Sequence, residues 1–441
     1  MREEMNTIQK TVAFLTLGCK VNSYDSEAMM EIFERGGYQI VDFSDFADVY
    51  VINTCTVTHL GDRKSRNMMR KARRRNPEAV IVATGCYAQV APEEVSAIEE
   101  VDLVLGTQKR KEILNFVEAY QADHQHRNFV TDIMKDKTFE DLYITENKGK
   151  TRAFLKVQEG CNRFCTYCII PYARGPIRSR PIDSVTEEVG RLVENGFKEM
   201  VLTGIHIASY GKDMPEDIDL LDLIKAVDAV PGVERIRLGS LEPLLLTEEF
   251  VKSLTEIKSF CPHFHLSLQS GCDTVLKRMG RRYTTEEYAA IVDRVRRYFE
   301  RPAITTDIMV GFPGETDEEF ETTLAFVKRI GFYQVHAFKY SRRKGTKAAD
   351  FPDQVDEQIK NLRAHRLAEV AEACEDHFLR ENDGAVEAVL FERRNKEGLY
   401  EGHTRNYIPV NLNSDEKIDG KILQVRVSYN QSKFHMSGKL A

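Results

Sequence analysis

The chain has 441 residues and a formal net charge of −7, because 62 Lys and Arg face 69 Asp and Glu. This balance excludes a uniformly basic nucleic-acid binder, so a nucleic-acid partner would have to be held by local basic patches. The length predicts two or three domains, and the hydrophobic content of 42% is typical of a soluble globular protein. Residues 1–10 are polar, unlike a secretory signal, and no apolar run approaches the roughly 18 residues of a membrane span. We therefore expect a cytoplasmic protein.

In the first stretch, to about residue 105, apolar runs alternate with amphipathic ones, which predicts a βαβα pattern and a parallel sheet. Ligands collect at the carboxyl ends of the strands in such sheets. Buried structural cysteines are the alternative interpretation, but loop positions are poor core positions. We expect three cysteines to converge at this edge and bind metal, each after an apolar run: Cys19 after Val12–Leu17, Cys55 after Val49–Asn53, and Cys86 after Val80–Thr84.

The rest of the chain divides by composition and periodicity. Residues 122–150 are polar and aperiodic, which indicates a connector. About six βα units follow to residue 347 and predict an open or partial α/β barrel, with its site at the carboxyl ends of the strands. A charged helix over 354–380 precedes a tail that is typical of a small all-β barrel. The expected strands are Ala153–Val157, Met200–Leu202, Ile236–Leu238, His265–Leu268, Thr305–Val310, Val335–Phe338, Ala385–Phe391, Tyr407–Leu412 and Ile422–Val427, and the expected helices include Ser184–Asn195 and Thr285–Tyr298.

Three cysteines, Cys161, Cys165 and Cys168, follow the first expected barrel strand with the spacing C-x3-C-x2-C. In a reducing compartment such spacing indicates metal binding or catalysis rather than disulfides. Three thiolates on one loop can hold three irons of a four-iron cluster and leave the fourth iron open to chelate S-adenosylmethionine. Structural zinc is the alternative, but it needs four closed ligands, and no fourth Cys or His follows nearby. We therefore expect a [4Fe-4S] cluster on this loop.

This loop resembles the signature of the radical S-adenosylmethionine (SAM) superfamily, in which an aromatic residue precedes the last cysteine. Tyr167 fills that place, and the resemblance implies that it packs near the adenine of SAM. Thr203-Gly204 resembles the segment near the methionine amino group, and Val310-Gly311 resembles the turn whose backbone meets the adenine. The resemblance therefore implies that Tyr167, Thr203, Gly204, Val310 and Gly311 bind the cofactor.

Motifs along nearly the whole chain resemble those of the methylthiotransferases: Gly18-Cys-Lys-Val-Asn22, Asn53-Thr-Cys55, Gly85-Cys-Tyr87 and Cys168-Ile-Ile-Pro-Tyr-Ala-Arg-Gly175. The resemblance implies an α/β fold in three parts, a parallel α/β domain, a partial (β/α)6 radical SAM barrel and a small all-β barrel like the TRAM domain. It also implies a second [4Fe-4S] cluster, on Cys19, Cys55 and Cys86, where the sulfur is delivered and methylated. We set the boundaries at 1–121 for the first domain, 122–150 for the connector, 151–347 for the central barrel, 348–382 for a helical extension and 383–441 for the TRAM-like barrel.

Two motifs resemble the subgroup that acts on N6-threonylcarbamoyladenosine (t6A) in tRNA: Gly18-Cys-Lys-Val-Asn22 and Ser240-Leu-Glu-Pro243. Enzymes for isopentenyladenosine tend to carry Cys-Gln-Met-Asn at the first place, and those for a ribosomal protein Cys-Pro-Lys-Asn. The resemblance implies methylthiolation of C2 of t6A at tRNA position 37, with an electron donor such as flavodoxin or ferredoxin and a sulfur source as further partners. Isopentenyladenosine in tRNA and a ribosomal protein stay open as alternative substrates. A non-catalytic RNA-binding metalloprotein is the alternative of another class.

A block of basic residues follows Cys55, and Asp62 is the only acid among them. Such a stripe can bind tRNA phosphates next to the active cleft. It stands out because the surrounding chain is acidic. A solvated helix face is the alternative interpretation. The residues that we expect to contact tRNA are Arg63, Lys64, Arg66, Arg70, Arg73 and Arg74.

Overall fold

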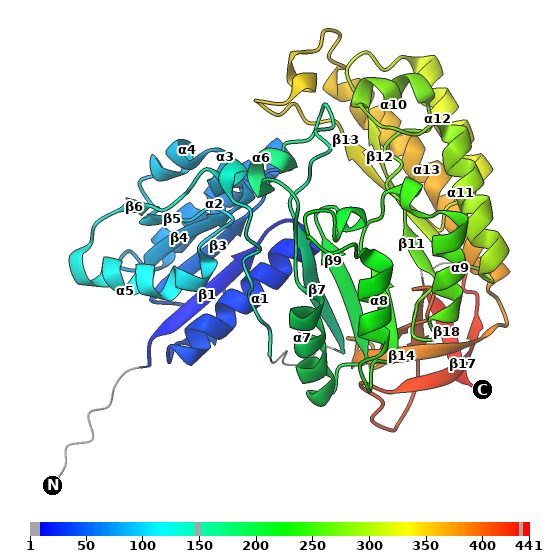
Figure 1. Ribbon diagram of the computed structural model, residues 1–441, viewed down its shortest axis with the longest axis horizontal. Helices are drawn as coiled ribbons and strands as arrows, with labels where there is room; N and C mark the ends of the chain where they lie inside the picture. Colours follow the sequence, from blue (N-terminus) through cyan, green and yellow to red (C-terminus); the bar gives the residue numbers. More distant parts are fainter. Residues whose placement is uncertain (1–8, 146–150, 432–434) are drawn as a thin grey trace.

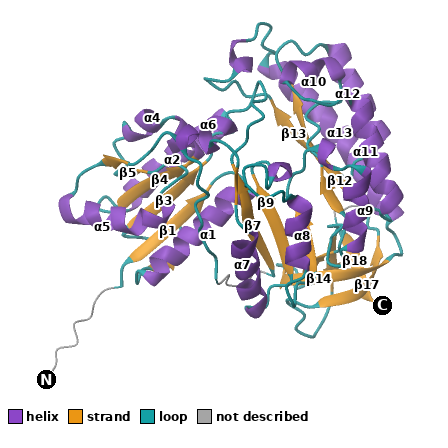
Figure 2. Ribbon diagram, in the orientation of Figure 1, coloured by secondary structure: helices purple, strands orange, loops and turns teal. Residues whose placement is uncertain are grey.

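The computed structural model describes residues 9–145, 151–431 and 435–441. Figure 1 shows three parts in chain order: an α/β domain, a larger central barrel, and a small barrel of strands beneath it, where the chain ends. Helices cover the outside of the central barrel, as the colouring of Figure 2 makes clear. Within the described ranges, no helix is long and apolar enough to cross a membrane.

The N-terminal domain is built on a parallel sheet with two helical layers. Cores on the two faces of the sheet are covered by different helices, α1 and α5 on one and α2 to α4 on the other. Because both faces are covered, the central strands β3 and β4 are buried throughout and mostly apolar, as parallel strands usually are. From one edge to the other the strands are β2 (Gln39–Val41), β1 (Thr11–Thr16), β3 (Val49–Thr54), β4 (Val80–Gly85), β5 (Leu103–Val104) and β6 (Arg127–Asn128). The helices are α1 (Lys20–Arg35), α2 (His59–Arg75), α3 (Cys86–Val90), α4 (Pro92–Ser96) and α5 (Ile113–Asp123), with 3-10 turns at Arg110–Glu112 and Ile133–Lys135.

The central part is an open barrel of six parallel strands. Two smaller sheets meet through single bridges, Ile236 with Phe260 and Leu241 with Leu266, and so form one curved wall. The strands in spatial order are β7 (Arg152–Glu159), β9 (Glu199–Gly204), β10 (Arg235–Leu238), β11 (His263–His265), β12 (Ala303–Val310) and β13 (Gln334–Lys339), and the short β8 (Arg178–Ser179) lies antiparallel beside β7. The helices are α6 (Ile170–Arg174), α7 (Ile182–Glu194), α8 (Leu220–Asp228), α9 (Glu248–Glu256), α10 (Asp273–Met279), α11 (Thr285–Tyr298) and α12 (Asp317–Ile330), with 3-10 turns at Ile207–Ser209, Pro243–Leu245 and Lys347–Asp350.

Local sequence signals fix where the outer helices begin. Thr284 caps α11 and Thr316 caps α12, and in both helices a Glu in the first turn returns a hydrogen bond to the capping residue. Each such box satisfies amide groups that the helix itself leaves without a partner. The apolar faces of these helices then pack on the barrel strands in the largest hydrophobic core of the protein.

The small barrel closes the amino-terminal end of the central one. Helix α13 (Glu357–Glu381) leads into it, and Arg235 at the start of β10 donates hydrogen bonds to the carbonyls of Ala388 at 2.6 Å and His403 at 2.9 Å. The amino ends of the central strands are therefore covered, and their carboxyl ends face the N-terminal domain. The barrel order is β14 (Val386–Arg394), β15 (Tyr400–His403), β16 (Pro409–Leu412), β18 (Met436–Leu440) and β17 (Ile422–Ser428).

The expected fold class is confirmed, with two corrections of detail. The strand expected over His265–Leu268 is found at His263–His265, because the next residues make only isolated bridges. The connector is not wholly irregular: it supplies β6, and its Leu142 carbonyl accepts a hydrogen bond from the Tyr24 hydroxyl at 2.5 Å. Its last residues, 146–150, lie outside the described part of the chain.

Candidate metal centres and active site

The loop after β7 holds the first group of cysteines. The Cys161 amide donates to the Gly175 carbonyl at 3.0 Å, and the Cys168 amide donates to the Cys165 carbonyl at 3.0 Å, which folds the loop into a turn. Gly160 has φ +75°, and a side chain there would lie 1.7 Å from the Pro176 carbonyl oxygen. Glycine is therefore required for the chain to leave the strand and curl over the open end of the barrel.

The electrostatic surroundings of these thiols favour a bound cation. Burial raises the pKa of Cys168 to about 12, and burial also raises the pKa of Cys161. A cation, Arg281, lies beside the loop, with its Nη1 3.6 Å from Cys165 Sγ. Since iron ligation requires thiolates, a multiply charged metal cluster supplies the positive charge that three adjacent thiolates need. The donor set therefore fits the expected [4Fe-4S] cluster.

A pocket of about 170 Å³ opens beside this loop and includes residues of both domains. Tyr167 and Cys168 line it together with Asp307 and Met309 of β12, and Val57 and Thr58 come to it from the loop before α2. The ring of Tyr167 also meets that of Phe312 edge to face, with centroids 6.4 Å apart. Of the residues expected to bind SAM, Tyr167 is therefore the one that lines this pocket.

The other expected SAM contacts lie near the pocket in the fold but not in its lining. Val310 is fully buried in the barrel core, and Thr203 is almost fully buried. At Gly311 a side chain would lie 2.1 Å from Lys360 Cγ, and its amide donates to Glu315 at 2.6 Å. Their backbone roles toward SAM stay predictions.

The second group of cysteines lies at the carboxyl ends of β1, β3 and β4, as expected. Cys19 precedes α1, Cys55 follows β3 and Cys86 begins α3. Gly18, with φ +109°, brings the first of these loops against the second, since a Cβ there would lie 3.1 Å from Cys55 Sγ. Burial, together with the neighbouring Cys86 and Cys19, raises the pKa of Cys55 to about 11. Three sulfur donors thus share one small volume, and this set also fits an iron–sulfur cluster.

Arg174, from the motif after Cys168, reaches across the domain boundary to this second group. Its Nε lies 3.2 Å from Cys86 Sγ. The same guanidinium bonds to Asn22 and to Glu159, and lies 3.0 Å from Asp25 Oδ2. Arg174 is fully buried, so this charge is available only to these partners. The loops that carry the two cysteine groups are therefore locked to each other.

A second buried contact joins the domains on the other side of the pocket. Arg343, which follows β13, donates to Asp62 Oδ2 at 2.6 Å and to the Thr56 hydroxyl at 2.5 Å. Thr56 directly follows Cys55, so this bond fixes the loop of the second cysteine group against the barrel. Together with Arg174, it joins the two domains beside the pocket.

Comparisons with known proteins agree with this architecture. Residues 155–327 match the radical SAM superfamily, and residues 11–106 match a family described as uncharacterized protein family UPF0004. The threonylcarbamoyladenosine tRNA methylthiotransferase MtaB of Bacillus subtilis (strain 168) is 44% identical over 434 residues, which cover 96% of each chain. The chain belongs to the radical SAM methylthiotransferase family.

One further relative and one solved structure extend the comparison. The tRNA-2-methylthio-N(6)-dimethylallyladenosine synthase of Acetivibrio thermocellus is 36% identical, over 97% of this chain and 90% of its own. Among solved structures, the radical SAM methyltransferase TsrM from Kitasatospora setae, with cobalamin and a [4Fe-4S] cluster bound, has a TM-score of 0.55 at 14% identity, covering 77% of this chain and 74% of that one. The second likeness is one of fold alone.

Membership of the family confirms the expected reaction class and cofactors. The methylthiotransferase is a radical SAM transferase, and its cofactors are SAM and [4Fe-4S] clusters. The non-catalytic metalloprotein is thereby excluded. Which cysteines bind which cluster stays a prediction, carried here by the positions of the two sulfur groups.

The basic block of the methylthiotransferase forms helix α2, but its members are not equivalent. Arg73 donates hydrogen bonds within its own domain, to Asp102 Oδ2 at 2.7 Å and to the Ala79 carbonyl at 2.8 Å. Arg66 bonds to the Tyr87 hydroxyl at 2.8 Å and to Glu94 at 3.0 Å, and Arg70 lies 3.8 Å from Glu100. By contrast, four side chains are exposed and have no hydrogen bond or ion pair within the described ranges: Arg63, Lys64, Lys71 and Arg74.

Several polar residues of the site were not predicted from the sequence. Lys156 and Glu159 on β7 and Arg110 are fully buried and paired, and His265, Asp307 and His336 lie together on β11 to β13. Arg174 stood inside a motif that we recognised, but the motif did not indicate that its guanidinium reaches Cys86. For the residues on strands, the available signal was a polar or charged side chain inside an apolar run.

Proposed function

We propose that this methylthiotransferase adds a methylthio group to C2 of N6-threonylcarbamoyladenosine at position 37 of tRNA. The observation that carries this proposal is the similarity over nearly the full length to relatives named for that substrate, 44% identical in Bacillus subtilis and 40% identical in Aquifex aeolicus. The synthase named for dimethylallyladenosine is less similar, at 36%. That base is the second candidate substrate.

The arrangement of the two cysteine groups supports the reaction. Cys161, Cys165 and Cys168 would hold the cluster that binds SAM, and Cys19, Cys55 and Cys86 would hold the cluster that carries the sulfur. When bound, the clusters and SAM would supply three things: a carbon radical, a sulfur atom and a methyl group. The radical would remove a hydrogen from the aromatic base, and the methyl group would come from SAM. The pocket beside Cys168 takes lining residues from both domains, and the buried contacts of Arg174 and Arg343 hold the two domains together.

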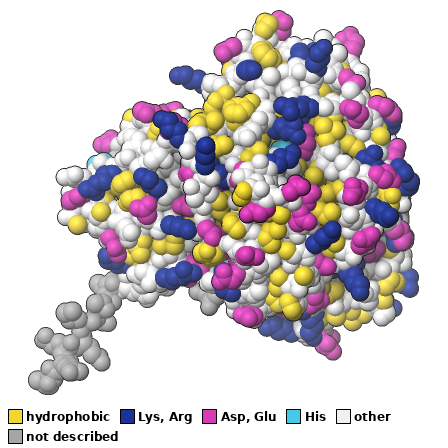
Figure 3. Space-filling model, viewed as in Figure 1, with side chains coloured by type: hydrophobic (Ala, Val, Ile, Leu, Met, Phe, Trp, Pro, Cys, Tyr) yellow, Lys and Arg dark blue, Asp and Glu magenta, His cyan; other side chains and the backbone are white. Residues whose placement is uncertain are grey.

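The partners follow from this chemistry. Reductive cleavage of SAM requires a one-electron donor, for which a flavodoxin or a ferredoxin is suitable, and the transferred sulfur must be replaced by a sulfur source. The tRNA would approach from the side on which α2 displays its free cations. Figure 3 shows Lys and Arg side chains gathered between the N-terminal domain and the upper part of the central barrel, beside a hydrophobic patch. A cationic surface next to an apolar one suits a folded RNA with exposed bases.

The test is an in vitro reaction with the reconstituted enzyme, SAM, a reductant and a sulfide source. Bulk tRNA from cells that lack the methylthio modification is the substrate, and its nucleosides are separated and weighed by mass spectrometry. A methylthio gain on t6A supports the proposal. A gain on dimethylallyladenosine alone would assign the second substrate, and a gain on ribosomal protein alone would overturn both.

A further inference from the structure

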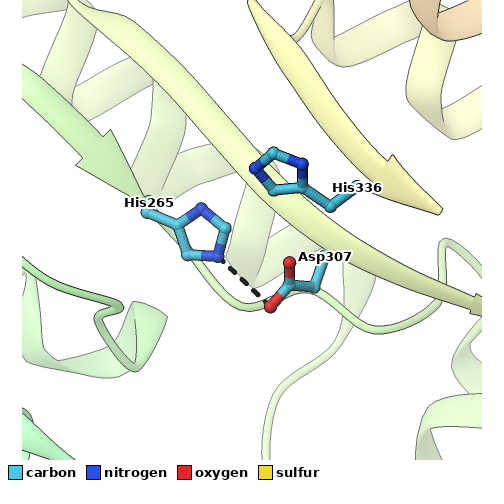
Figure 4. Close-up of side chains that lie close together, drawn as sticks. All are labelled: His265, Asp307 and His336. Atoms are coloured by element: carbon cyan, nitrogen blue, oxygen red, sulfur yellow. Dashed lines mark ion pairs between the residues drawn. The ribbon is translucent and has the colours of Figure 1, made fainter. Parts of the chain in front are cut away.

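Three side chains of the kinds that bind metal ions meet on neighbouring strands of the central barrel. His265, Asp307 and His336 come from β11, β12 and β13, and one ligand atom of each lies within 4.8 Å of those of the other two. Figure 4 shows His265 and Asp307 pointing toward each other, with the His336 ring facing them from the next strand. Strand register explains the cluster, because Asp307 pairs with His336, and His265 pairs with Thr305 on the same face of β12.

The distance between His265 and Asp307 suits a shared metal ion. His265 Nε2 lies 3.3 Å from Asp307 Oδ2. Two ligands of a tetrahedral zinc ion are separated by about 3.3 Å, because each metal–ligand bond is roughly 2.0–2.1 Å long. The rings of His265 and His336 are stacked with their centroids 5.7 Å apart, so a side-chain rotation of His336 can bring a ring nitrogen to the same ion.

A hydrogen bond behind the cluster orients His265 as a metal ligand. The Nδ1 atom of His265 lies 3.0 Å from the Thr305 hydroxyl. In metal sites, a histidine ligand commonly donates its second ring N–H in this way. When Nδ1 donates this bond, the Nε2 lone pair faces the Asp307 carboxylate, and two such acceptors need a proton or a metal ion between them.

His336 is available as the third ligand. Its side chain is exposed and has no hydrogen bond or ion pair among the described residues. The barrel wall beside it lowers the pKa of His336 by desolvation, which favours the neutral ring that coordinates metal. The positive charge of Lys20 also lowers this pKa and would oppose a cation, so we expect a moderate affinity.

We propose that His265, Asp307 and His336 bind one divalent transition-metal ion, such as Zn²⁺ or Mn²⁺, at a site separate from both cysteine groups. Two histidines and one carboxylate are a ligand set that zinc and other first-row metals accept, and they leave a coordination position open for water or an oxygen of a ligand. Asp307 also lines the pocket beside Tyr167 and Cys168. The inference goes beyond the proposed function, because the site would bind metal whichever base is the substrate.

The experiment counts the metal bound by the cluster-loaded enzyme, in which the cluster cysteines are already occupied. The protein is dialysed anaerobically against Zn²⁺ or, separately, Mn²⁺, and metal and iron per chain are measured by mass spectrometry. We expect one equivalent of added metal, bound with a micromolar dissociation constant. Asp307→Asn and His336→Phe should each weaken binding at least about a hundredfold, and Thr305→Val about tenfold, since it removes only the hydrogen bond that orients His265.

A matched control tests whether any histidine beside a carboxylate would bind the ion. His365 is exposed on α13, and its Nε2 lies 3.4 Å from Glu369, but among the described residues this pair belongs to no group of three ligands. His365→Phe should therefore keep the full equivalent of metal. His336→Ala is a second variant in case the phenylalanine perturbs packing, and an unchanged iron content shows that each variant is folded and loaded.

The outcomes decide for or against the site. Loss of the added equivalent in the Asp307 and His336 variants, with iron unchanged and His365→Phe unaffected, would uphold the proposal. If the wild type binds neither ion at concentrations well above micromolar, the proposal is overturned, and His265 and Asp307 form an ordinary ion pair. An equivalent that persists in both Asp307→Asn and His336→Ala would also overturn it, because the metal would then be bound elsewhere.

Discussion

Arg174 Nε lies 3.2 Å from Cys86 Sγ, and both residues are buried between the two domains that carry the cysteine groups. The ion pairs around this contact join more cations than carboxylates, so one positive charge is left over and faces the sulfur. A buried, uncompensated cation is costly, and a thiolate or a thiolate-bound cluster of net negative charge balances it. The cations are Arg110, Lys156, Arg174 and Arg178, and the carboxylates are Asp25, Glu140 and Glu159.

Replacing Arg174 by Gln should therefore damage the second metal centre and the domain contact together. The change leaves the thiolate-bound centre at Cys86 without its counter-charge, and removing one partner of such a buried pair costs about 3–5 kcal/mol. We expect lower free energy of unfolding and iron content reduced toward half, because Cys86 loses its counter-charge while the loop of Cys161 is untouched. Urea unfolding and iron analysis on the same sample measure both effects. Full iron retention in Arg174→Gln, with normal stability, would contradict the role given to this charge.

The loop after β7 makes a separate prediction. Each of Cys161→Ala, Cys165→Ala and Cys168→Ala should remove about half of the bound iron and abolish reductive cleavage of SAM, because the cluster loses one of its three protein ligands. Cys374→Ala is the matched control, since this partly buried thiol lies on α13, where its Sγ lies 3.9 Å from the Val327 carbonyl. The assay is 5′-deoxyadenosine formation with dithionite under anaerobic conditions. If Cys165→Ala still forms this product, the loop does not hold the radical cluster.

The sequence predicted the parts of this molecule that depend on local pattern. Apolar runs with a following cysteine located β1, β3 and β4, and helix signals placed α11 within its observed bounds. The strands β15 and β18 were missed, because Gly402 and Gly438 weaken the apolar alternation. These glycines are required by packing: a side chain would lie 2.6 Å from the Leu390 carbonyl oxygen or 2.7 Å from Val425 Cγ1. Close approach between distant strands has no local signature.

The features of the site divide in the same way into those that local sequence predicts and those that only domain packing creates. The spacing of the cysteines indicated iron–sulfur chemistry, because the ligands of one cluster are close in sequence or follow equivalent strands. The partnership of Arg174 with Cys86 connects residues far apart in the chain. Likewise, the sequence predicted one basic stripe on α2, whereas Arg73 is paired with Asp102 and Arg74 has no hydrogen bond or ion pair to any residue that the structure describes. Such distinctions arise only when the domains are packed.

Helix α2 yields a prediction that separates free from engaged cations. Changing the four exposed residues Arg63, Lys64, Lys71 and Arg74 to Gln should weaken tRNA binding and lower the slope of log K against log salt by up to about three units, since each phosphate contact releases counterions. Arg73→Gln is the contrasting variant. It should cost about 1–3 kcal/mol of stability, because the buried Asp102 loses the guanidinium among its partners, and leave the salt slope unchanged. A slope that is the same in the fourfold variant and the wild type would return α2 to the role of a solvated face.

The final prediction separates the two cysteine groups by function. Cys55 lies in the N-terminal domain, and its neighbour Thr56 is bonded to Arg343, whereas the loop of Cys161 is built on β7 and Gly175. A Cys55→Ala protein should therefore keep the radical cluster, retain about half of its iron, and still cleave SAM to 5′-deoxyadenosine. It should fail to form methylthio product, because the metal that would hold the sulfur is gone.

The alternative, that Cys19, Cys55 and Cys86 are core cysteines, predicts a different pattern. Substituting a partly buried thiol by alanine would then cost some stability and leave iron and product unchanged. Iron stoichiometry, 5′-deoxyadenosine and methylthio nucleoside are measured on one preparation, with Cys261→Ala as the control, since Cys261 is buried near Arg237 and belongs to neither group. Normal methylthio product from the triple alanine variant of Cys19, Cys55 and Cys86 would falsify the two-cluster mechanism, even if the radical loop passed its own test. Loss of SAM cleavage in Cys55→Ala alone would instead show that the second centre is needed to assemble the first, through the buried contacts of Arg174.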